Sequence, residues 1–530
     1  MRRLVVFIMA MVPLPALAPV TADAVTTKAR TSCTAPATTA PPGARVESVS
    51  AVHEPGGTIS FPPQPPVPAP PPISGVPAYC DITVTLTHPG ANDHVRIKVL
   101  LPESGWNGRF QAVGGSGYAA GDFGAPLIGA VKAGYAAAST DAGHSLSFVD
   151  AGWALTADGK VDLPRLRDFA SLAPHETAVV GKQVTQRFYG HGPAYSYWNG
   201  CSTGGRQGYM EAQRHPTDFQ GIVADAPALG WDRFAVATLW PYVVQNQQHT
   251  FLTSCEFEAF NAAAVKACDG LDGIRDGVIG DALHCHYDPR RLIGTTIVCD
   301  GEPVTITAAA ADVVARIWEG PTTLAGTRLG NGPLPGASFT GLSAPVTGPD
   351  GTPSWQPFII AAEWVQNFLE RRPGFDTSGI TYAEFARLFR QSQAEYHDII
   401  GTDDPDLSAF ARAGGRLLTF HGLADQLIPT RNTVDYRRRV EQTMGGSERV
   451  DRFYRLFLAP GVAHCGGGGP TPADPLAAVT AWVEHGKAPD TLPATVPGTN
   501  ATRQLCRYPL ISRYTGGDPA DPAAYRCAHA

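Results

Sequence analysis

The sequence predicts an α/β fold, in which a mostly parallel, doubly wound sheet is interrupted by a large insertion. Short apolar or alternating runs, typical of strands, take turns with longer amphipathic stretches, typical of helices, between residues 80 and 226 and again after 412. The chain between them, 227–412, is irregular, rich in Gly and Pro, and holds four of the ten Cys. Because the strand–helix rhythm resumes after it, we interpret this stretch as a lid domain inserted into one sheet.

The predicted elements follow one another from Asp81 onward. Two alternating runs, 82–87 and 95–100, flank a Pro-Gly turn and predict an antiparallel hairpin at one edge of the sheet. Residues 25–80 lack periodicity, and eight prolines within 62–72 favour an extended surface strap. Further strands are expected at 109–113, 194–198, 221–224, 416–420 and 453–458, and helices at 164–189, around 210–214, at 431–444 and at 473–486.

Composition limits the classes of partner. The 530 residues carry a formal net charge of −7, and only 17% of them are charged. No basic block is present, so we expect neither nucleic acid nor an anionic membrane surface as a partner. The 57 Gly and 47 Pro favour turns and ordered loops over coiled coil or long helical arrays.

The N-terminus has the organisation of a secretory signal peptide. Met1-Arg2-Arg3 is basic, residues 4–18 are almost wholly apolar, and Ala22-Asp23-Ala24 offers a cleavage site, which predicts removal of residues 1–24. The apolar run is short and broken by Pro, which disfavours the alternative of a membrane anchor. We therefore expect a secreted protein, or a periplasmic one in a Gram-negative host. In such an oxidising compartment ten Cys predict five disulfides, and Asn500 begins a glycosylation sequon.

The segment 200–204, Gly-Cys-Ser-Thr-Gly, matches the pattern G-x-S-x-G between a predicted strand and a predicted helix. In that context the pattern is typical of a nucleophile elbow, a strained turn that exposes the hydroxyl of Ser202. The alternative is a Gly-rich turn without chemistry.

A serine nucleophile needs a base, and the base needs an acid that orients it. In α/β-hydrolases the acid and then the histidine follow the serine along the chain, in loops after later strands. Asp425 follows the predicted strand 416–420, and His464 follows 453–458. Ser202, Asp425 and His464 are therefore the predicted triad of an α/β-hydrolase fold, although chain order alone also admits accidental triples. The mature chain then divides into a first catalytic part with the Pro-rich strap, a lid domain and a second catalytic part, at 25–226, 227–412 and 413–530.

Two cysteines flank the predicted triad. Cys201 directly precedes Ser202, and Cys465 directly follows His464. If Ser202 and His464 are within hydrogen-bond reach, these cysteines fall close to the range of a disulfide. We therefore predict a Cys201–Cys465 bridge that joins the two loops, with two buried free thiols as the alternative.

Hydrolysis of an ester through a serine also requires hydrogen-bond donors for the developing oxyanion. One donor is the backbone N–H after the nucleophile, here that of Thr203. The second is expected from a Gly-rich turn after an early strand, and 114–117, Gly-Gly-Ser-Gly, fits that place. A plain tight turn is the alternative.

The predicted lid contains an acidic motif at 268–279. Asp269, Asp272 and Asp276 lie within eight residues, and their carboxylates repel one another unless a cation neutralises them. Oxygen ligands separated by Gly suit Ca²⁺, and Ile274 and Val278 would add backbone carbonyls. We predict a structural calcium site here, with an acidic surface turn as the alternative.

Taken together, these residues resemble the tannase and feruloyl esterase family of secreted α/β-hydrolases. The resemblance is carried above all by the Cys-Ser, Asp and His-Cys arrangement, and it extends from about 80 to 527. Its motifs are 106–110 (Trp-Asn-Gly-Arg-Phe), 199–208, the acidic motif, 404–407, 421–429, 459–466 and 482–489.

The resemblance implies catalytic roles for the matching positions. Ser202 would be the nucleophile that forms the acyl-enzyme, His464 the general base and acid, and Asp425 the acid that orients it. Gly117 and Thr203 would donate to the oxyanion.

The resemblance also implies substrate contacts from Ser116, which lines the site, and from His421 and Ile428, which flank the acid. A relative that hydrolyses a terephthalate monoester carries an aromatic residue at the position of Ile428, and the lid arginine with which it grips a carboxylate has no match here. The family pattern further supports the pairings Cys268–Cys285 and Cys506–Cys527. Cys33–Cys80 then follows by position, and the remaining two cysteines form Cys255–Cys299.

The expected activity is that of a serine esterase acting on feruloyl, other hydroxycinnamoyl or galloyl esters, with a small aryl ester such as a terephthalate monoester as the alternative. Serine peptidases and lipases share G-x-S-x-G but are disfavoured by the acidic motif and the paired cysteines. A secreted binding protein with a retired site is disfavoured by the intact Ser, Asp, His and Gly turn.

Overall fold

The computed structural model describes residues 33–64, 67–347, 353–499 and 501–530. The predicted signal peptide and Asn500 lie outside them. Within the described residues a nine-stranded sheet dominates, and no helix there is long and apolar enough to cross a membrane. In spatial order its strands are β1 (Arg45–Glu54), β4 (Tyr79–Thr87), β5 (Val95–Pro102), β7 (Ala136–Thr140), β6 (Arg109–Val113), β8 (Tyr195–Cys201), β9 (Gly221–Asp225), β14 (Arg416–Gly422) and β15 (Tyr454–Ala459).

The sheet has an antiparallel part and a parallel part. Strands β1, β4, β5 and β7 pair antiparallel in turn, whereas β7, β6, β8, β9, β14 and β15 all run parallel. The predicted α/β class, the parallel sheet and the β4–β5 hairpin are therefore present. The hairpin is not at the edge, however, because β1, from the segment interpreted as a strap, pairs with β4 outside it. Strand β7 was not predicted.

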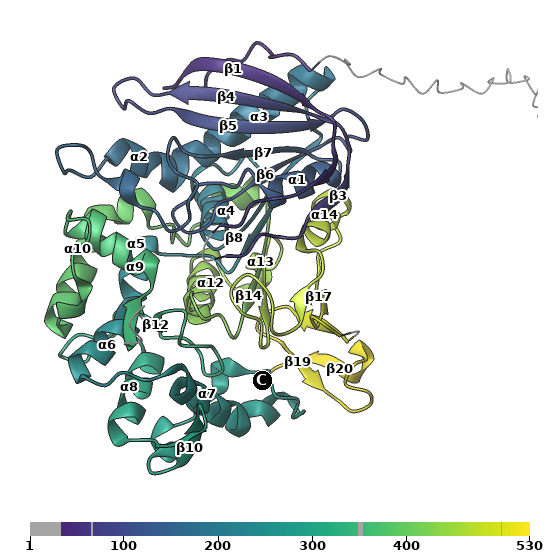
Figure 1. Cartoon of the computed structure of the whole chain (residues 1–530). Helices are drawn as coiled ribbons and strands as arrows, with labels where there is room; N and C mark the ends of the chain where they lie inside the picture. Colours follow the sequence, from purple (N-terminus) through teal and green to yellow (C-terminus); the bar gives the residue numbers. More distant parts are fainter. Residues whose placement is uncertain (1–32, 65–66, 348–352, 500) are drawn as a thin grey trace, which may run out of the picture.

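Helices cover both faces of the sheet, as expected of a doubly wound fold (Figure 1). Alternate residues of β8 show the division, since Tyr197 packs in a cluster with α1 and α14, and Trp198 packs in another with α3, α4 and α12. These helices are α1 (Ala125–Lys132), α2 (Leu163–Arg167), α3 (Ala173–Tyr189), α4 (Thr203–Arg214), α12 (Thr430–Met444), α13 (Ser447–Val450) and α14 (Pro475–His485). A π-helical turn at 168–172 joins α2 to α3.

A long insertion separates β9 from β14, although these strands are neighbours in the sheet. It is more helical than its irregular sequence predicts, and in Figure 1 it lies below the sheet in teal and green. Its elements are α5 (Trp231–Ala237), α6 (Trp240–Gln248), α7 (Ser254–Cys268), α8 (Ala308–Glu319), α9 (Ile359–Glu363), α10 (Tyr382–Ile400), α11 (Ser408–Arg412) and two hairpins, β10–β11 (Thr296–Cys299, Glu302–Thr305) and β12–β13 (Ser343–Thr347, Pro353–Pro357).

The hydrophobic core continues from the sheet into the insertion. Trp231, Phe368 and Tyr396 of the insertion belong to the same buried cluster as Phe169 and Trp198. The insertion is thus packed into the main body on one side. Small sheets complete the fold, formed by β2–β3 (Gly57–Ile59, Ile73–Val76), β16–β18 (Thr471–Pro472, Thr491–Thr495, Thr502–Cys506) and β19–β20 (Ile511–Tyr514, Tyr525–Ala528).

Candidate active site

Ser202 lies in the sharp turn between β8 and α4. Its backbone has φ 63° and ψ −120°, a region that is strained for a residue with a side chain. The turn closes because its neighbours are Gly: a methyl group on Gly200 would lie 2.6 Å from the carbonyl of Gly204. The Ser202 N–H donates to the carbonyl oxygen of Asp225 at 3.0 Å. The structure therefore has the predicted strand, elbow and helix.

Asp425, in the loop after β14, faces His464, in the loop after β15. The Asp425 Oδ2 atom lies 2.9 Å from His464 Nδ1, and its Oδ1 accepts the N–H groups of Leu427 and Ile428 at 2.9 and 2.8 Å. Burial alone would raise the pKa of Asp425, but the charge of His464 and the side-chain hydrogen bonds with His421 and His464 hold it well below its usual value. The carboxylate is therefore ionised, and it engages the Nδ1 side of the imidazole.

His421, for which a substrate contact is predicted, lies beside Asp425 at the end of β14. Its ring is fully buried, with Nε2 at 3.0 Å from Asp425 Oδ2 and Nδ1 at 2.9 Å from Thr433 Oγ1. The side chain points inward from the end of β14 and supports Asp425 from behind. Ile428, the other predicted contact beside the acid, is also buried. Ser116, in contrast, is exposed on the Gly-rich turn.

Three connections hold the His464 loop against the rest of the site. The Cys201–Cys465 disulfide, with Cα atoms 5.9 Å apart, ties it to the residue before Ser202. The side-chain oxygen of Gln426 accepts the His464 N–H at 2.9 Å. The Asp425–His464 contact is the third. Gln426 was missed by the sequence analysis, because a side chain that binds a backbone N–H has no motif, although its position next to Asp425 was a clue.

The Gly-rich turn packs against the start of α4. The Gly204 N–H donates to the Gly115 carbonyl at 2.9 Å, and the Thr203 hydroxyl donates to the Gly117 carbonyl at 2.7 Å. Gly117 has φ 52°, and a methyl group there would lie 2.1 Å from the carbonyl oxygen of Phe148. In the described part of the chain neither the Gly117 nor the Thr203 N–H has a protein acceptor. Both groups are therefore free to bind an oxyanion.

A family model described as tannase and feruloyl esterase matches residues 80–528. The chain belongs to the tannase and feruloyl esterase family. A probable feruloyl esterase from Arthroderma benhamiae is 45% identical over 500 residues, which cover 92% of this chain and 91% of that protein. A probable feruloyl esterase B-2 from Neosartorya fischeri is 34% identical over 391 residues, 68% and 71% of the two chains.

Solved structures agree with this assignment. Tannin acyl hydrolase from Aspergillus niger superposes with a TM-score of 0.82 at 27% identity, over 92% of each chain. Feruloyl esterase B from Aspergillus oryzae superposes with a TM-score of 0.76 at 29% identity, over 92% of this chain and 97% of that one. This member of the tannase and feruloyl esterase family is a carboxylic ester hydrolase that acts on esters of aromatic acids.

The acidic motif of this esterase forms a short 3-10 turn followed by a loop, 269–279. The Asp269 carboxylate accepts hydrogen bonds from the N–H groups of Asp276 and Gly277 at 3.1–3.2 Å. The Asp276 carboxylate accepts one from the Val278 N–H at 3.3 Å. Burial and the charges of Asp276 and Asp269 raise the pKa of Asp272 to about 6. Three carboxylates that repel one another in an oxygen-only loop fit a hard cation such as Ca²⁺.

The disulfides of this esterase pair as the sequence analysis expected. All ten Cys lie in the described residues, and none is free. Besides Cys201–Cys465, the bridges are Cys33–Cys80, Cys255–Cys299, Cys268–Cys285 and Cys506–Cys527.

Proposed function

We propose that this protein is a secreted serine esterase that hydrolyses feruloyl, other hydroxycinnamoyl or galloyl esters through Ser202, His464 and Asp425. The observation that carries the proposal is the joining of three loops: the Asp425–His464 contact at 2.9 Å and the disulfide between Cys201 and Cys465. Because each cysteine is the direct neighbour of Ser202 or His464, the bridge keeps nucleophile and base close together.

The chemistry then follows from the protonation of the three groups. Asp425 holds His464 by Nδ1, which leaves Nε2 as the base that takes the proton of the Ser202 hydroxyl. The serine oxygen attacks the ester carbonyl, and the negatively charged oxygen of the tetrahedral intermediate accepts hydrogen bonds from the N–H groups of Gly117 and Thr203. His464 returns the proton to the departing alcohol, and an acyl-enzyme remains.

In the second half of the reaction a water molecule enters beside His464. The imidazole removes a proton from it, the resulting hydroxide attacks the acyl carbonyl, and the aromatic acid leaves as Ser202 regains its proton. The same two N–H groups stabilise the second oxyanion. Loss of one such donor is expected to cost about 10²–10³ in kcat.

The insertion is proposed to act as a lid that contributes to the substrate site. Its Gly341 touches the acid loop, since a methyl group there would lie 2.7 Å from Leu427 Cδ2 and 2.9 Å from the Gln426 carbonyl oxygen. Ser116, exposed on the Gly-rich turn, lines the same region. Recognition of the acyl group is therefore assigned to the insertion and the Gly-rich turn, rather than to His421 or Ile428.

A hydrolysis panel tests the function. Methyl ferulate, methyl gallate, chlorogenate and a terephthalate monoester are supplied to the wild type and to Ser202→Ala, which is expected to lose activity by roughly 10⁶-fold. Turnover of the terephthalate monoester alone would favour the small aryl ester alternative. Activity only on peptides or long-chain triglycerides would favour a peptidase or lipase, and binding without turnover a retired site.

Calcium is proposed as a structural ion of the insertion, held by Asp269, Asp272 and Asp276 with carbonyl oxygens of Ile274 and Val278. It neutralises the carboxylates and takes no part in hydrolysis. Chelation of calcium is expected to lower the Tm of the wild type and to leave that of Asp272→Asn almost unchanged. An equal shift in both proteins would contradict the site.

A further inference from the structure

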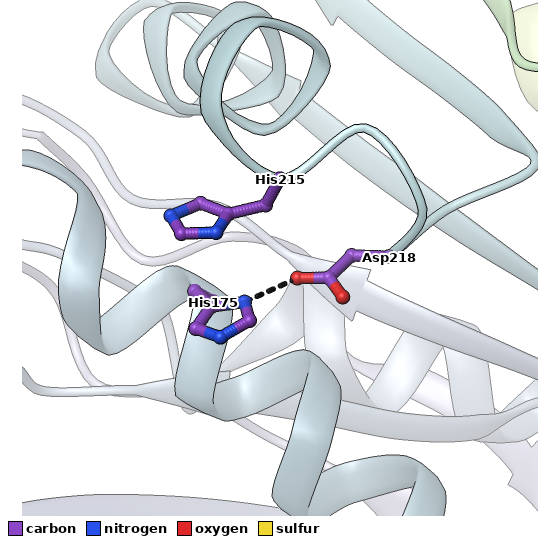
Figure 2. Close-up of side chains that lie close together, drawn as sticks. All are labelled: His175, His215 and Asp218. Atoms are coloured by element: carbon purple, nitrogen blue, oxygen red, sulfur yellow. Dashed lines mark hydrogen bonds and ion pairs between the residues drawn. The ribbon is translucent and has the colours of Figure 1, made fainter. Parts of the chain in front are cut away.

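A second cluster of titratable side chains lies at the other end of α4 from Ser202. His175 belongs to α3, His215 follows the last residue of α4, and Asp218 lies in the turn that leads into β9. One ligand atom of each lies within 4.8 Å of the other two. Figure 2 shows that the two imidazoles lie one above the other beside the Asp218 carboxylate.

The contacts within the cluster leave one imidazole uncommitted. His175 Nδ1 lies 2.5 Å from Asp218 Oδ2, whereas His215 stacks on His175 with ring centroids 4.0 Å apart and planes at 13°. The ring of His215 makes no hydrogen bond to another described residue, so its nitrogens are available as ligands. A neutral imidazole with a free nitrogen is the form that binds metals.

A buried carboxyl group stands behind the cluster. Glu211, one helical turn before His215 on α4, is fully buried, and neither of its carboxylate oxygens has a hydrogen-bond partner among the described residues. Glu211 faces the Asp218 carboxylate, a group of like charge. A buried carboxyl group without a partner costs free energy, and a nearby cation would offset that cost.

We propose that His175, His215 and Asp218 bind a divalent transition-metal ion, best Zn²⁺, with Glu211 as a further ligand or as the charge that supports Asp218. Imidazole nitrogen and carboxylate oxygen suit Zn²⁺, whereas Ca²⁺ takes oxygen ligands almost alone. Access is open, because His175 and His215 are only partly buried.

Binding requires one local rearrangement. The lone pair of an imidazole nitrogen lies in the plane of its ring. Because the rings of His175 and His215 are stacked, their lone pairs lie in two parallel planes, and one ring must turn before both can point at the same ion. His215 is free to do so, because its ring makes no hydrogen bond to another described residue and it lies at a helix end. His175 gives up the Nδ1–H that faces Asp218 and keeps the Nε2–H, so that Nδ1 becomes a ligand. Each Zn–N distance is then expected to be about 2.0–2.1 Å.

The ion would connect α3, α4 and the turn before β9, and it would lie too far from Ser202 to take part in hydrolysis. α4 has 12 residues, so its ends are about 18 Å apart, and the cluster is that far from Ser202. Lys182 competes with the ion, because its ammonium lies 3.7 Å from Asp218 Oδ1 and 2.9 Å from the Asp218 carbonyl. The site is therefore one that stabilises the packing of α3, α4 and β9.

Calorimetric titration of the full mature protein with Zn²⁺, at saturating Ca²⁺, tests the proposal. The wild type is expected to bind one equivalent that His215→Ala lacks, and Zn²⁺ should raise the Tm of the wild type alone. His485→Ala is the matched control, because His485 is exposed on α14 outside the cluster, and it should bind as the wild type does. Equal binding by wild type and His215→Ala would overturn the site, as would absence of uptake by the wild type.

Two further variants keep the test sharp if His215→Ala folds poorly. Glu211→Gln should weaken binding by roughly 10- to 100-fold, as expected of a group that supports a ligand. Lys182→Met removes the competing cation and should tighten it. Unchanged affinity in both would contradict the proposal. Co²⁺ can replace Zn²⁺ in this titration, because its visible absorption spectrum reports nitrogen and oxygen ligands. The spectrum of bound Co²⁺ is expected in the wild type and not in the single variant His215→Ala.

Discussion

The two ends of α4 treat a buried carboxyl group in opposite ways. Near its start, Asp425 accepts hydrogen bonds from His464, His421 and two backbone N–H groups, and its pKa is held low. At its end, Glu211 faces the Asp218 carboxylate, to which it can hydrogen-bond only when one of the two groups is protonated, and its pKa is raised. Both side chains are buried, so the sign of the neighbouring charge, together with the hydrogen bonds, decides which carboxyl group is ionised.

The difference is whether the protein itself supplies the groups that each buried carboxyl group needs: it does so at Asp425 and does not at Glu211. Around Asp425 every group needed to orient His464 is already supplied by the chain. Around Glu211 the protein offers nitrogen and oxygen donors but no positive charge in contact with the carboxyl group. The first end is prepared for proton transfer, and the second is completed by a proton or by a metal ion.

The largest expected effect on kcat comes from removing the negative charge of Asp425, near the start of α4. Asp425→Asn keeps the volume but allows His464 to adopt the wrong tautomer, so kcat on a methyl hydroxycinnamate or gallate ester should fall by about 10⁴-fold. Steady-state kinetics measure it, with circular dichroism to check the fold. A loss of less than tenfold would mean that Asp425 does not orient the base.

Removal of the Cys201–Cys465 bridge should be the next largest effect. The double variant Cys201→Ala/Cys465→Ala frees a loop closed over 264 residues, and the free energy of unfolding should fall by about 2–5 kcal/mol. Because this bridge joins the active-site loops, kcat should fall as well. The matched control, Cys506→Ala/Cys527→Ala, should lose stability while keeping kcat. Equal losses of kcat in both variants would contradict a special role for the bridge.

Gln426 offers a finer test of the same end. Gln426→Leu leaves the His464 N–H without its acceptor, so the loop shifts and kcat should fall by about 10- to 100-fold with little change in KM. Gln426→Glu retains an acceptor and should recover most of kcat, with the acid limb of the pH profile displaced to higher pH by the added negative charge. No recovery in Gln426→Glu would argue that only side-chain shape matters.

The smallest effect is expected at the incomplete end. A carboxyl group with a raised pKa stabilises the folded state fully below its unfolded pKa, and this contribution is lost as pH rises through the folded pKa. Glu211→Gln removes that dependence, so the free energy of unfolding of the variant should rise relative to that of the wild type as the pH increases above the unfolded pKa of a glutamate. Urea unfolding in chelating buffer measures it. Parallel curves for the two proteins would show that Glu211 does not titrate in this range.

Much of the fold was readable from local patterns. The β4–β5 hairpin alternates in sequence and in burial, and the elbow at Ser202 combines a strand, small residues and a helix. Strand β7 was not predicted, because its residues, Ala136–Thr140, are all buried and so show no alternation of apolar and polar side chains. Most of them are alanine, which does not favour strands. Strand β1 escaped because it lies at the edge, where its side chains are half-exposed and no clear pattern forms.

The candidate site was readable in part for a related reason. The order Ser202, Asp425, His464 follows from strand ends, which the sequence marks. The environments of His421, near the end of β14, and of Ile428, in the loop before α12, depend on which way each side chain turns, and the sequence does not mark that. The cluster of His175 with His215 and Asp218 arises only when α3 packs against α4, so spacing along the chain carries no sign of it.

The disulfide beside Ser202 also affects how the protein is made. Cys201 leaves the ribosome long before Cys465, and at typical synthesis rates the 264 intervening residues take roughly 13–50 s. During that time Cys201 meets the four cysteines of the insertion, none of which is its partner in the finished fold. If the protein is secreted as proposed, correct pairing is expected to require a disulfide isomerase or slow exchange in the export compartment. A host that lacks such exchange is expected to yield a chain with mispaired cysteines and an unassembled Ser202 site.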